Sequence, residues 1–180
     1  KQGLSITAET TPHHLCPNEN DISSAQDTFF KMNPPLRTAI DNRALLSALK
    51  SKVIDAIATD HAPHSIEEKT TGFLKAPFGI IGLETTIPWL YTALVQKKRL
   101  SFFRLIECLT KAPADILNLE YSPIIEGQSL NFVIFNKSKK SILDQKFFYS
   151  KGHNFPLINQ TLNGKIEMVL YNNSLYDFTE

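Results

Sequence analysis

Apolar positions with helical spacing run through the middle of the chain. Residues 41–51 place Leu45, Leu46 and Leu49 on one face, after Asp41 as a candidate N-cap. This pattern predicts an amphipathic helix that leads into a buried strand. Similar spacing predicts three further helices at 83–97, 101–110 and 112–119, the last opened by Pro113. Together these helices would form one layer of the fold.

Short apolar runs predict strands on either side of those helices. Residues 4–10 form a strand pattern that stops at Thr11-Pro12, and 53–59 are mostly apolar, as is typical of a parallel sheet covered on both faces. The segment 21–35 is predicted to be irregular, because Pro34 and Pro35 remove backbone donors. Three late strands are predicted at 130–135, 166–171 and 174–177. We therefore expect an α/β fold with two parts, 1–120 and 121–180.

Composition narrows the class of protein. The chain has 180 residues, 42% of them hydrophobic, with 19 Lys and Arg against 18 Asp and Glu, so its net charge of +1 argues against a nucleic-acid partner. Cys16 and Cys108 have no Cys-x-x-Cys spacing, which favours a reducing, cytoplasmic setting. No apolar run is long enough to span a membrane, and no signal peptide is evident. Because Lys1 falls inside a strand pattern, a fragment of a longer chain is expected.

The clearest candidate for chemistry is the sequence TDHAPH, which places Asp60 directly after the predicted buried strand 53–59. In parallel α/β folds, the carboxyl ends of strands open onto the active-site face. An aspartate there can ligate a hard metal ion and can also move a proton. The alternative is that Asp60 only caps the following turn, with His61 and His64 exposed.

Three other motifs carry polar groups with weaker individual signals. In TPHHL, adjacent histidines on extended backbone would point to opposite faces, so that at most one, His13 or His14, faces a site. In KMNPPLR, Asn33 can donate and accept, which suits the edge of a cyclic amide, although a turn with Arg37 paired to a carboxylate is the alternative. The glycines around Phe78-Gly79 would let backbone approach a ligand, but a glycine pattern alone is weak.

Taken in order, the motifs resemble the second half of a dihydroorotase, of the class that is similar to hydantoinases and to the dihydroorotase part of multifunctional pyrimidine-pathway enzymes. The resemblance extends from about Ile6 to Tyr176. Its most specific stretches are TPHHL, KMNPPLR, ATDHAPH with EEK, PFGIIGLET and SKGHNFP. It implies the C-terminal portion of a (β/α)8 metal-dependent hydrolase barrel, with strands of a small companion β-sheet domain.

The resemblance also implies roles for individual residues. Asp60 would be the catalytic aspartate, a ligand of one zinc ion that takes a proton from the metal-bridging hydroxide and delivers it to the leaving amide nitrogen. Asn33 and His64 would contact the substrate, and Phe78 and Gly79 would bind it largely through backbone. The histidines of TPHHL belong to the family pattern, but we do not assign them as primary zinc ligands.

The chain departs from the family pattern by lacking everything upstream. Dihydroorotases of this class begin with a His-x-His pair and a carboxylate-binding arginine, followed by a bridging carboxylated lysine or aspartate and two more histidines. Asp60 is then the only expected zinc ligand present, whereas a catalytic zinc needs about three protein ligands. We therefore expect one or two zinc ions in the intact parent, but no zinc and no activity in this chain alone.

For the parent, the resemblance implies reversible cyclisation of N-carbamoyl-L-aspartate to L-dihydroorotate in de novo pyrimidine biosynthesis. Another cyclic amidohydrolase, a hydantoinase or allantoinase, is the nearest alternative. A non-catalytic dihydroorotase-like subunit that supports aspartate transcarbamoylase is a second, and a freestanding binding module is a third. Expected partners are the small-molecule substrate, together with a second copy of the chain or aspartate transcarbamoylase, and neither nucleic acid nor a membrane.

Overall fold

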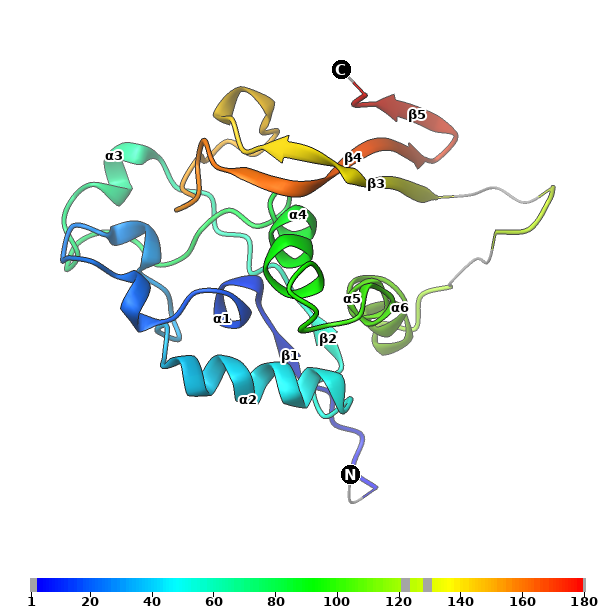
Figure 1. Ribbon diagram of the computed structural model, residues 1–180, viewed down its shortest axis with the longest axis horizontal. Helices are drawn as coiled ribbons and strands as arrows, with labels where there is room; N and C mark the ends of the chain where they lie inside the picture. The colour runs from blue at the N-terminus through cyan, green and yellow to red at the C-terminus, as the bar shows by residue number, and fades with distance from the viewer. Residues whose placement is uncertain (1–2, 121–123, 128–130, 180) are drawn as a thin grey trace.

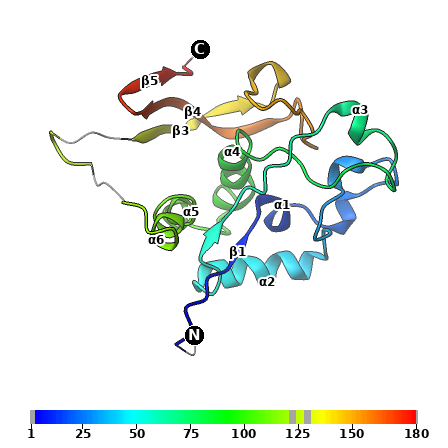
Figure 2. The same cartoon turned by 180° about the vertical axis from the view of Figure 1, so that it is seen from behind.

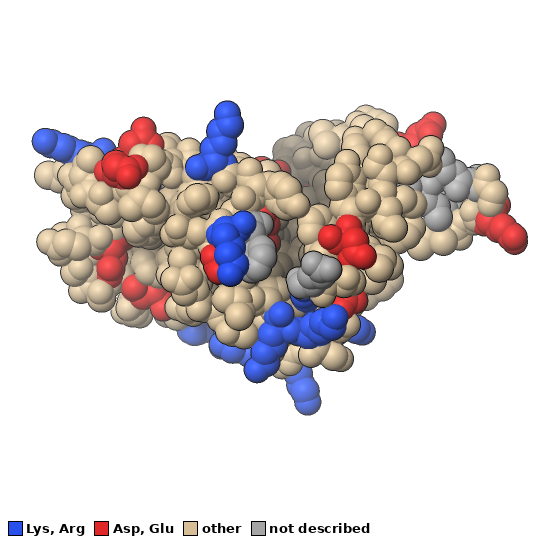
Figure 3. Space-filling view, turned by 90° about the horizontal axis from the view of Figure 1, so that it is seen from above, with Lys and Arg blue, Asp and Glu red and all other residues tan. Residues whose placement is uncertain are grey.

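The computed structural model describes residues 3–120, 124–127 and 131–179, which form a mixed α/β structure with two small sheets. The antiparallel sheet lies across helix α4 (Thr86–Leu90). The parallel strands β1 (Glu9–Thr10) and β2 (Ala56–Ile57) lie between α4 and helix α2 (Ala39–Lys50) (Figures 1 and 2). No described helix is both long enough and apolar enough to cross a membrane. Seen from above, basic and acidic side chains share the surface, with a group of basic side chains near the lower edge of the view (Figure 3).

The parallel sheet contains two strands of two residues each. Strands β1 (Glu9–Thr10) and β2 (Ala56–Ile57) pair in parallel, with Glu9 opposite Ala56. The backbone N–H groups of Asp55 and Ala58 donate to the carbonyls of Ala8 and Thr10 at 2.8 and 2.9 Å. The predicted strands at 4–10 and 53–59 are therefore too long. Among the described residues, only Glu9–Thr10, at the end of the first prediction, and Ala56–Ile57, in the middle of the second, pair as strands. Leu4 and Ile6 are each 65% exposed.

Helix α2 (Ala39–Lys50) confirms the predicted amphipathic helix, but its cap differs from the prediction. Thr38 is the N-cap, and its hydroxyl accepts hydrogen bonds from the N–H groups of Ile40 and Asp41. The Asp41 carboxylate in turn accepts from the N–H of Thr38 at 3.0 Å, which completes a capping box. Leu46 and Leu49 bury the inner face, as the spacing predicts.

The helical layer contains three helices in sequence. Helix α4 (Thr86–Leu90) continues into a π-helical turn, η3 (Tyr91–Val95), so the predicted helix at 83–97 begins three residues late. Helix α5 (Phe102–Leu109) confirms the prediction for 101–110, and the Ser101 hydroxyl caps it by accepting from the N–H of Arg104. Helix α6 (Lys111–Ile116) tolerates Pro113 because that residue lies in its first turn.

Four short helical elements occupy segments that were expected to be loops or extended backbone. Their bounds are α1 (Pro12–Leu15), η1 (Glu19–Asp21), η2 (Thr28–Phe30) and α3 (Ile66–Lys69). The expectation of extended backbone at TPHHL is wrong. Thr11 caps α1 by accepting from the N–H of His14, and Pro12 occupies the first helical position, where no N–H is needed.

The antiparallel sheet has the order β3 (Phe132–Ile142), β4 (Thr161–Tyr171) and β5 (Ser174–Asp177), and η4 (Gln145–Phe147) follows β3. The two later strands confirm the predictions, although β4 begins at Thr161. The predicted first strand starts at residue 130, which lies outside the described residues. Asn172 and Asn173 join β4 to β5 with φ of 48° and 62°, as a type I′ hairpin turn requires.

Two apolar clusters hold the helices and sheets together. One is centred on Leu49, Leu90 and Leu105, each fully buried, and lies between α2 and the helical layer. The other joins Trp89 of α4 to Phe155, whose rings meet edge to face at 5.0 Å. Leu143 and Leu162 from the antiparallel-sheet region complete this second cluster. The division of the chain at residues 120 and 121 stays a prediction.

Candidate active site

Asp60 lies just beyond the carboxyl end of β2, where chemistry is expected in a parallel sheet. Its φ is 49°, a left-handed conformation that turns the chain sharply after the strand. The side chain is 56% exposed, and its Oδ2 atom lies 3.7 Å from Nε2 of His13. The carboxylate is therefore open on one side and bordered by an imidazole on the other.

His13 is the residue of TPHHL that turns toward Asp60. Its side chain is only 2% exposed, and Nε2 has no hydrogen-bond partner among the described residues. Burial, with a smaller contribution from His14, lowers the pKa of His13 to about 3. His13 is therefore neutral near pH 7. His14 turns elsewhere, with Nε2 3.0 Å from the carbonyl oxygen of Pro34, and so ties TPHHL to KMNPPLR.

The two histidines after Asp60 have structural contacts. Nδ1 of His61 accepts from the N–H of Gly82 at 3.0 Å, which links this loop to the GLE motif. Nε2 of His64 lies 3.1 Å from the carbonyl oxygen of Phe78, and Nδ1 of His64 lies 3.7 Å from a carboxylate oxygen of Glu68. The alternative in which both histidines are simply exposed is wrong, because both are partly buried and bonded.

The Phe78–Gly79 segment sits beside His64, as a shared site requires. The Phe78 ring is 51% exposed, whereas Gly79 is buried with φ of 95°. A Cβ atom at Gly79 would lie 2.6 Å from Cβ of Ala62, so only glycine fits. The N–H of Gly79 donates to the carbonyl oxygen of Lys31 at 2.9 Å, which places KMNPPLR next to PFG.

Asn33 is exposed, as is Pro34 after it, whereas Met32 before it is buried. Its side chain makes no hydrogen bond to any other described residue, so both Oδ1 and Nδ2 are open to a ligand. The adjacent residues are held in place, since Lys31 bonds to the 74–79 segment and the Pro34 carbonyl faces His14. The alternative role for this motif, an ion pair of Arg37 with a carboxylate, does not occur among the described ion pairs.

Asn154, in SKGHNFP, connects the motifs more directly than any residue that sequence reasoning assigned. It is fully buried, and its Oδ1 accepts from the N–H of His64 at 2.9 Å. Its Nδ2 donates to the carbonyl oxygens of Ala62 and Gly79 at 2.9 and 3.2 Å. The signal that could have found it is its position inside a motif that the resemblance depends on.

A metal ion fits these residues only in part. Asp60 offers an accessible carboxylate oxygen, which is a suitable donor for a zinc ion. Among the described residues, however, no group of three or more His, Cys, Asp or Glu side chains could hold a metal together. Cys16 does not change this, because burial raises its pKa to about 12 and disfavours the thiolate. This chain alone therefore supplies less than a catalytic metal site.

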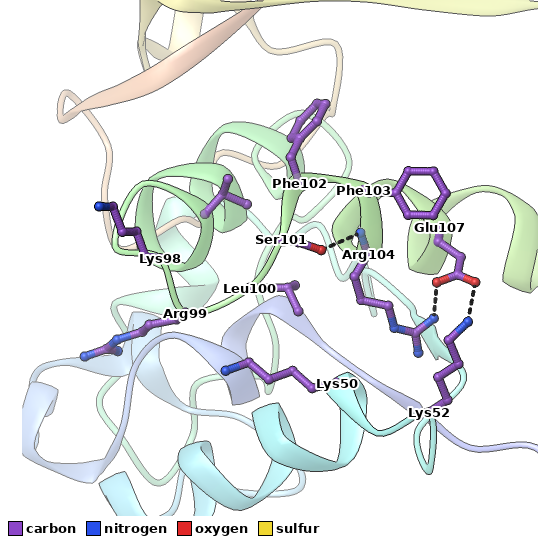
Figure 4. A pocket seen from close by; sticks show the side chains of 11 residues that line it. Lys50, Lys52, Lys98, Arg99, Leu100, Ser101, Phe102, Phe103, Arg104 and Glu107 are labelled. Carbon is purple, nitrogen blue, oxygen red and sulfur yellow. Dashed lines mark hydrogen bonds and ion pairs between the residues drawn. The ribbon is translucent and has the colours of Figure 1, made fainter.

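The two cavities that the structure describes lie apart from these residues. The larger, about 730 Å³, is lined by basic and apolar side chains from the end of α2 and the start of α5, as Figure 4 shows. The smaller, about 370 Å³, is lined mainly by apolar residues, including Phe29 and Phe155. Neither contains Asp60, Asn33, His64 or Gly79. Neither cavity therefore includes the candidate site at the strand ends.

Comparison with known proteins shows which sequences the chain is similar to. No protein-family model matches the chain. Dihydroorotases from Bacillus cereus (strain AH820), Bacillus anthracis (strain A0248) and Bacillus thuringiensis (strain Al Hakam) are each 46% identical to it over 164 residues, 91% of this chain. The matched residues are therefore similar to part of a dihydroorotase. The chain spans 38% of the length of these dihydroorotases.

Solved structures agree with a dihydroorotase-type fold. An L-hydantoinase (dihydropyrimidinase) from Arthrobacter aurescens matches 97% of this chain and 40% of its own, with a TM-score of 0.86 and 26% identity. A D-hydantoinase from a Thermus species has a TM-score of 0.83 at 22% identity. The inactive dihydroorotase-like domain of a Chaetomium thermophilum CAD-like multifunctional protein has a TM-score of 0.68 at 20% identity. The last two matches support the fold alone.

Proposed function

We propose that the complete protein carrying this chain is a dihydroorotase, which reversibly cyclises N-carbamoyl-L-aspartate to L-dihydroorotate in de novo pyrimidine biosynthesis. The observation that carries the proposal is the placement of Asp60 at the end of β2, in a sequence 46% identical to dihydroorotases. The 180-residue chain alone is expected to be inactive, because it supplies one carboxylate to a metal that needs about three protein ligands.

The proposed architecture of the complete protein is a (β/α)8 barrel with a small companion sheet. Residues 1–120 would contribute the C-terminal part of the barrel, including the parallel pair β1–β2 and its helices. Residues 121–180 would contribute the C-terminal strands of the companion domain. The structural match to hydantoinases over 97% of this chain supports this arrangement.

Asp60 is the proposed proton carrier. Opening the dihydroorotate ring requires a proton to move from the attacking water to the departing amide nitrogen. The Asp60 carboxylate is exposed enough to meet both groups, and the buried, neutral His13 beside it adds no positive charge. One or two zinc ions, when bound, would polarise the ring carbonyl and make hydroxide available near neutral pH.

Substrate orientation is assigned to Asn33, His64, Phe78 and Gly79. Asn33 can offer a donor and an acceptor to the edge of a cyclic imide. His64 is oriented for a substrate contact by its Nε2 atom, which lies 3.1 Å from the carbonyl oxygen of Phe78. The Phe78–Gly79 backbone would bind the substrate, and the absence of a Cβ at Gly79 lets this turn pack against Ala62. Holding the ring in one orientation lowers the barrier by positioning.

The direct test is Asp60→Asn in the complete, zinc-loaded protein, with Asp115→Asn as a matched control on the exposed surface of α6. General acid–base catalysis contributes about 100-fold to 10,000-fold, so kcat for dihydroorotate hydrolysis should fall by at least about 100-fold in Asp60→Asn only. Circular dichroism should stay native in both variants. Near-wild-type turnover by Asp60→Asn would refute the assignment.

Two companion measurements separate the alternatives. Zinc content and turnover, measured on the complete protein beside the 180-residue chain, should be present in the first and absent in the second. A panel of dihydroorotate, hydantoin and allantoin then tests the substrate, and turnover of either of the last two without the first would favour another cyclic amidohydrolase. Mass measurement with and without added aspartate transcarbamoylase tests the two expected partners, a second copy and that enzyme.

A further inference from the structure

Two lysines from different motifs are buried without a carboxylate partner. Lys31 of KMNPPLR is 8% exposed, and Lys69 of EEK is fully buried. Neither forms an ion pair with any described residue. Buried charges are normally paired because removing them from water is costly. Their retention therefore requires another use for the two ammonium groups.

Both ammonium groups bind backbone carbonyls of one short segment, residues 74–79. Nζ of Lys69 donates to the carbonyl oxygens of Pro77 and Gly79, each at 3.0 Å. Nζ of Lys31 donates to those of Leu74 and Ala76 at 3.2 and 2.6 Å. The four bonds hold four of the six carbonyl groups of the segment.

Aromatic rings complete the environment of the two ammonium groups. Nζ of Lys31 lies 4.5 Å from the ring centroid of Phe78, in the segment, and 5.6 Å from that of Phe73, just before it, which gives two cation–π contacts. Nζ of Lys69 lies 6.0 Å from the ring centroid of Phe29. Lys31 therefore contacts both the backbone and a side chain of the segment that carries Phe78.

Burial of the two ammonium groups carries a desolvation cost. Burial, and then repulsion by Lys31, lower the pKa of Lys69 to about 8. Apolar side chains of similar length would fill the same volume without that cost. Apolar side chains, however, could not donate hydrogen bonds to the carbonyl groups that Gly79, with φ of 95°, turns toward the interior. The two lysines thus favour one conformation of the segment over its alternatives.

We propose that Lys31 and Lys69 are positioning residues that fix the Phe78–Gly79 backbone at the geometry required to bind the cyclic amide substrate. The inference rests on the proposed function, because it assigns the substrate contact to this turn. Both lysines act through the turn and need no contact with substrate themselves. Their loss should weaken substrate binding more than it slows the chemical step at Asp60.

The test uses Lys31→Met and Lys69→Met in the complete, zinc-loaded protein. Lys75→Met is the matched control, because Lys75 lies in the same segment with an exposed side chain. In the two buried-lysine variants, KM for dihydroorotate should rise about tenfold or more, with kcat within about threefold of wild type. Hydrogen exchange of the amides in 74–80 should accelerate in those variants and stay unchanged in Lys75→Met.

The outcomes distinguish this inference from the proposed function. If the wild-type protein does not turn over dihydroorotate, the proposed function fails. In that case hydrogen exchange still tests the positioning role, which is overturned if the amides of 74–80 exchange at the wild-type rate in Lys31→Met and Lys69→Met. If the wild-type protein is active, a KM in both variants equal to that of Lys75→Met overturns the inference. Loss of native circular dichroism in both methionine variants also overturns it, because the lysines would then be determinants of the whole fold.

Discussion

Arg104 of α5 is a buried cation that joins α5 to the chain around β2, and its removal gives a measurable stability prediction. The residue is 8% exposed. Its Nε donates to the carbonyl oxygen of Leu49 at 2.9 Å, and Nη2 donates to that of Ile54 at 3.0 Å. Its Nη1 pairs with Glu107 at 2.8 Å, and Lys52 pairs with the same carboxylate, as Figure 4 shows. The guanidinium therefore satisfies carbonyl groups at the end of α2 and just before β2.

Arg104→Met should keep the apolar stem and remove those bonds. Each hydrogen bond to a charged group contributes about 1.5 to 3 kcal/mol, so losing the two short carbonyl bonds should lower the free energy of unfolding by about 4 kcal/mol. Lys50→Met is the control, since Lys50 lines the same cavity with an exposed side chain and should change stability by less than about 0.5 kcal/mol.

Urea denaturation of the 180-residue chain measures both variants, with the fluorescence of the single tryptophan, Trp89, as the probe. Trp89 is buried in α4, so its emission should report loss of the core. The slope against urea should be equal in wild type and both variants, which would show that the same surface unfolds. A loss below about 1 kcal/mol in Arg104→Met would refute the role of these bonds.

Two further predictions use the same denaturation assay. Because the folded pKa of His13 is about 3 against 6.5 in the unfolded chain, the unfolded state binds the extra proton. Stability is therefore intact above pH 6.5 and is lost as pH falls toward 3, by about 2 kcal/mol between about pH 7 and about pH 5. This loss of unfolding free energy should be absent from His13→Gln. The same pH dependence of stability in wild type and His13→Gln would contradict the prediction. Gly152→Ala would place a Cβ 2.6 Å from the backbone nitrogen of His64, so it should destabilise the chain by about 1 to 3 kcal/mol, and an unchanged urea midpoint would contradict the close approach.

Local patterns in the sequence predict those elements whose determinants are local. The leucine spacing of α2 and the Ser101 cap of α5 act within a few residues, and both helices occur as predicted. The Asn172-Asn173 turn is similar, because asparagine tolerates positive φ. The strands β1 and β2 are shorter than predicted because their length depends on a partner nearly fifty positions away.

Some residues of the candidate site could likewise be predicted from the sequence, and others could not. Asp60 and the Phe78–Gly79 turn could be named from the motifs, and the structure brings His64 beside Phe78. The burial of Lys69 could not be predicted, since a lysine is normally exposed and here the acceptors come from a separate turn. Which histidine of TPHHL turns toward Asp60 could not be predicted either, because the helical turn of α1, rather than strand alternation, directs the His13 ring there.

The hydrogen bonds of Asn154 have a consequence for the order of folding. Asn154 reaches back to His64 and Ala62, which precede it by 90 and 92 positions, and both bonds are formed by one side chain. Such long-range contacts form late, since a large loop must close before they give any stabilisation. During synthesis, the turn after Asp60 lacks this support until residue 154 has left the ribosome. The site is therefore assembled only after almost all of this chain has been made, and a product truncated before that residue would carry the motifs without the site.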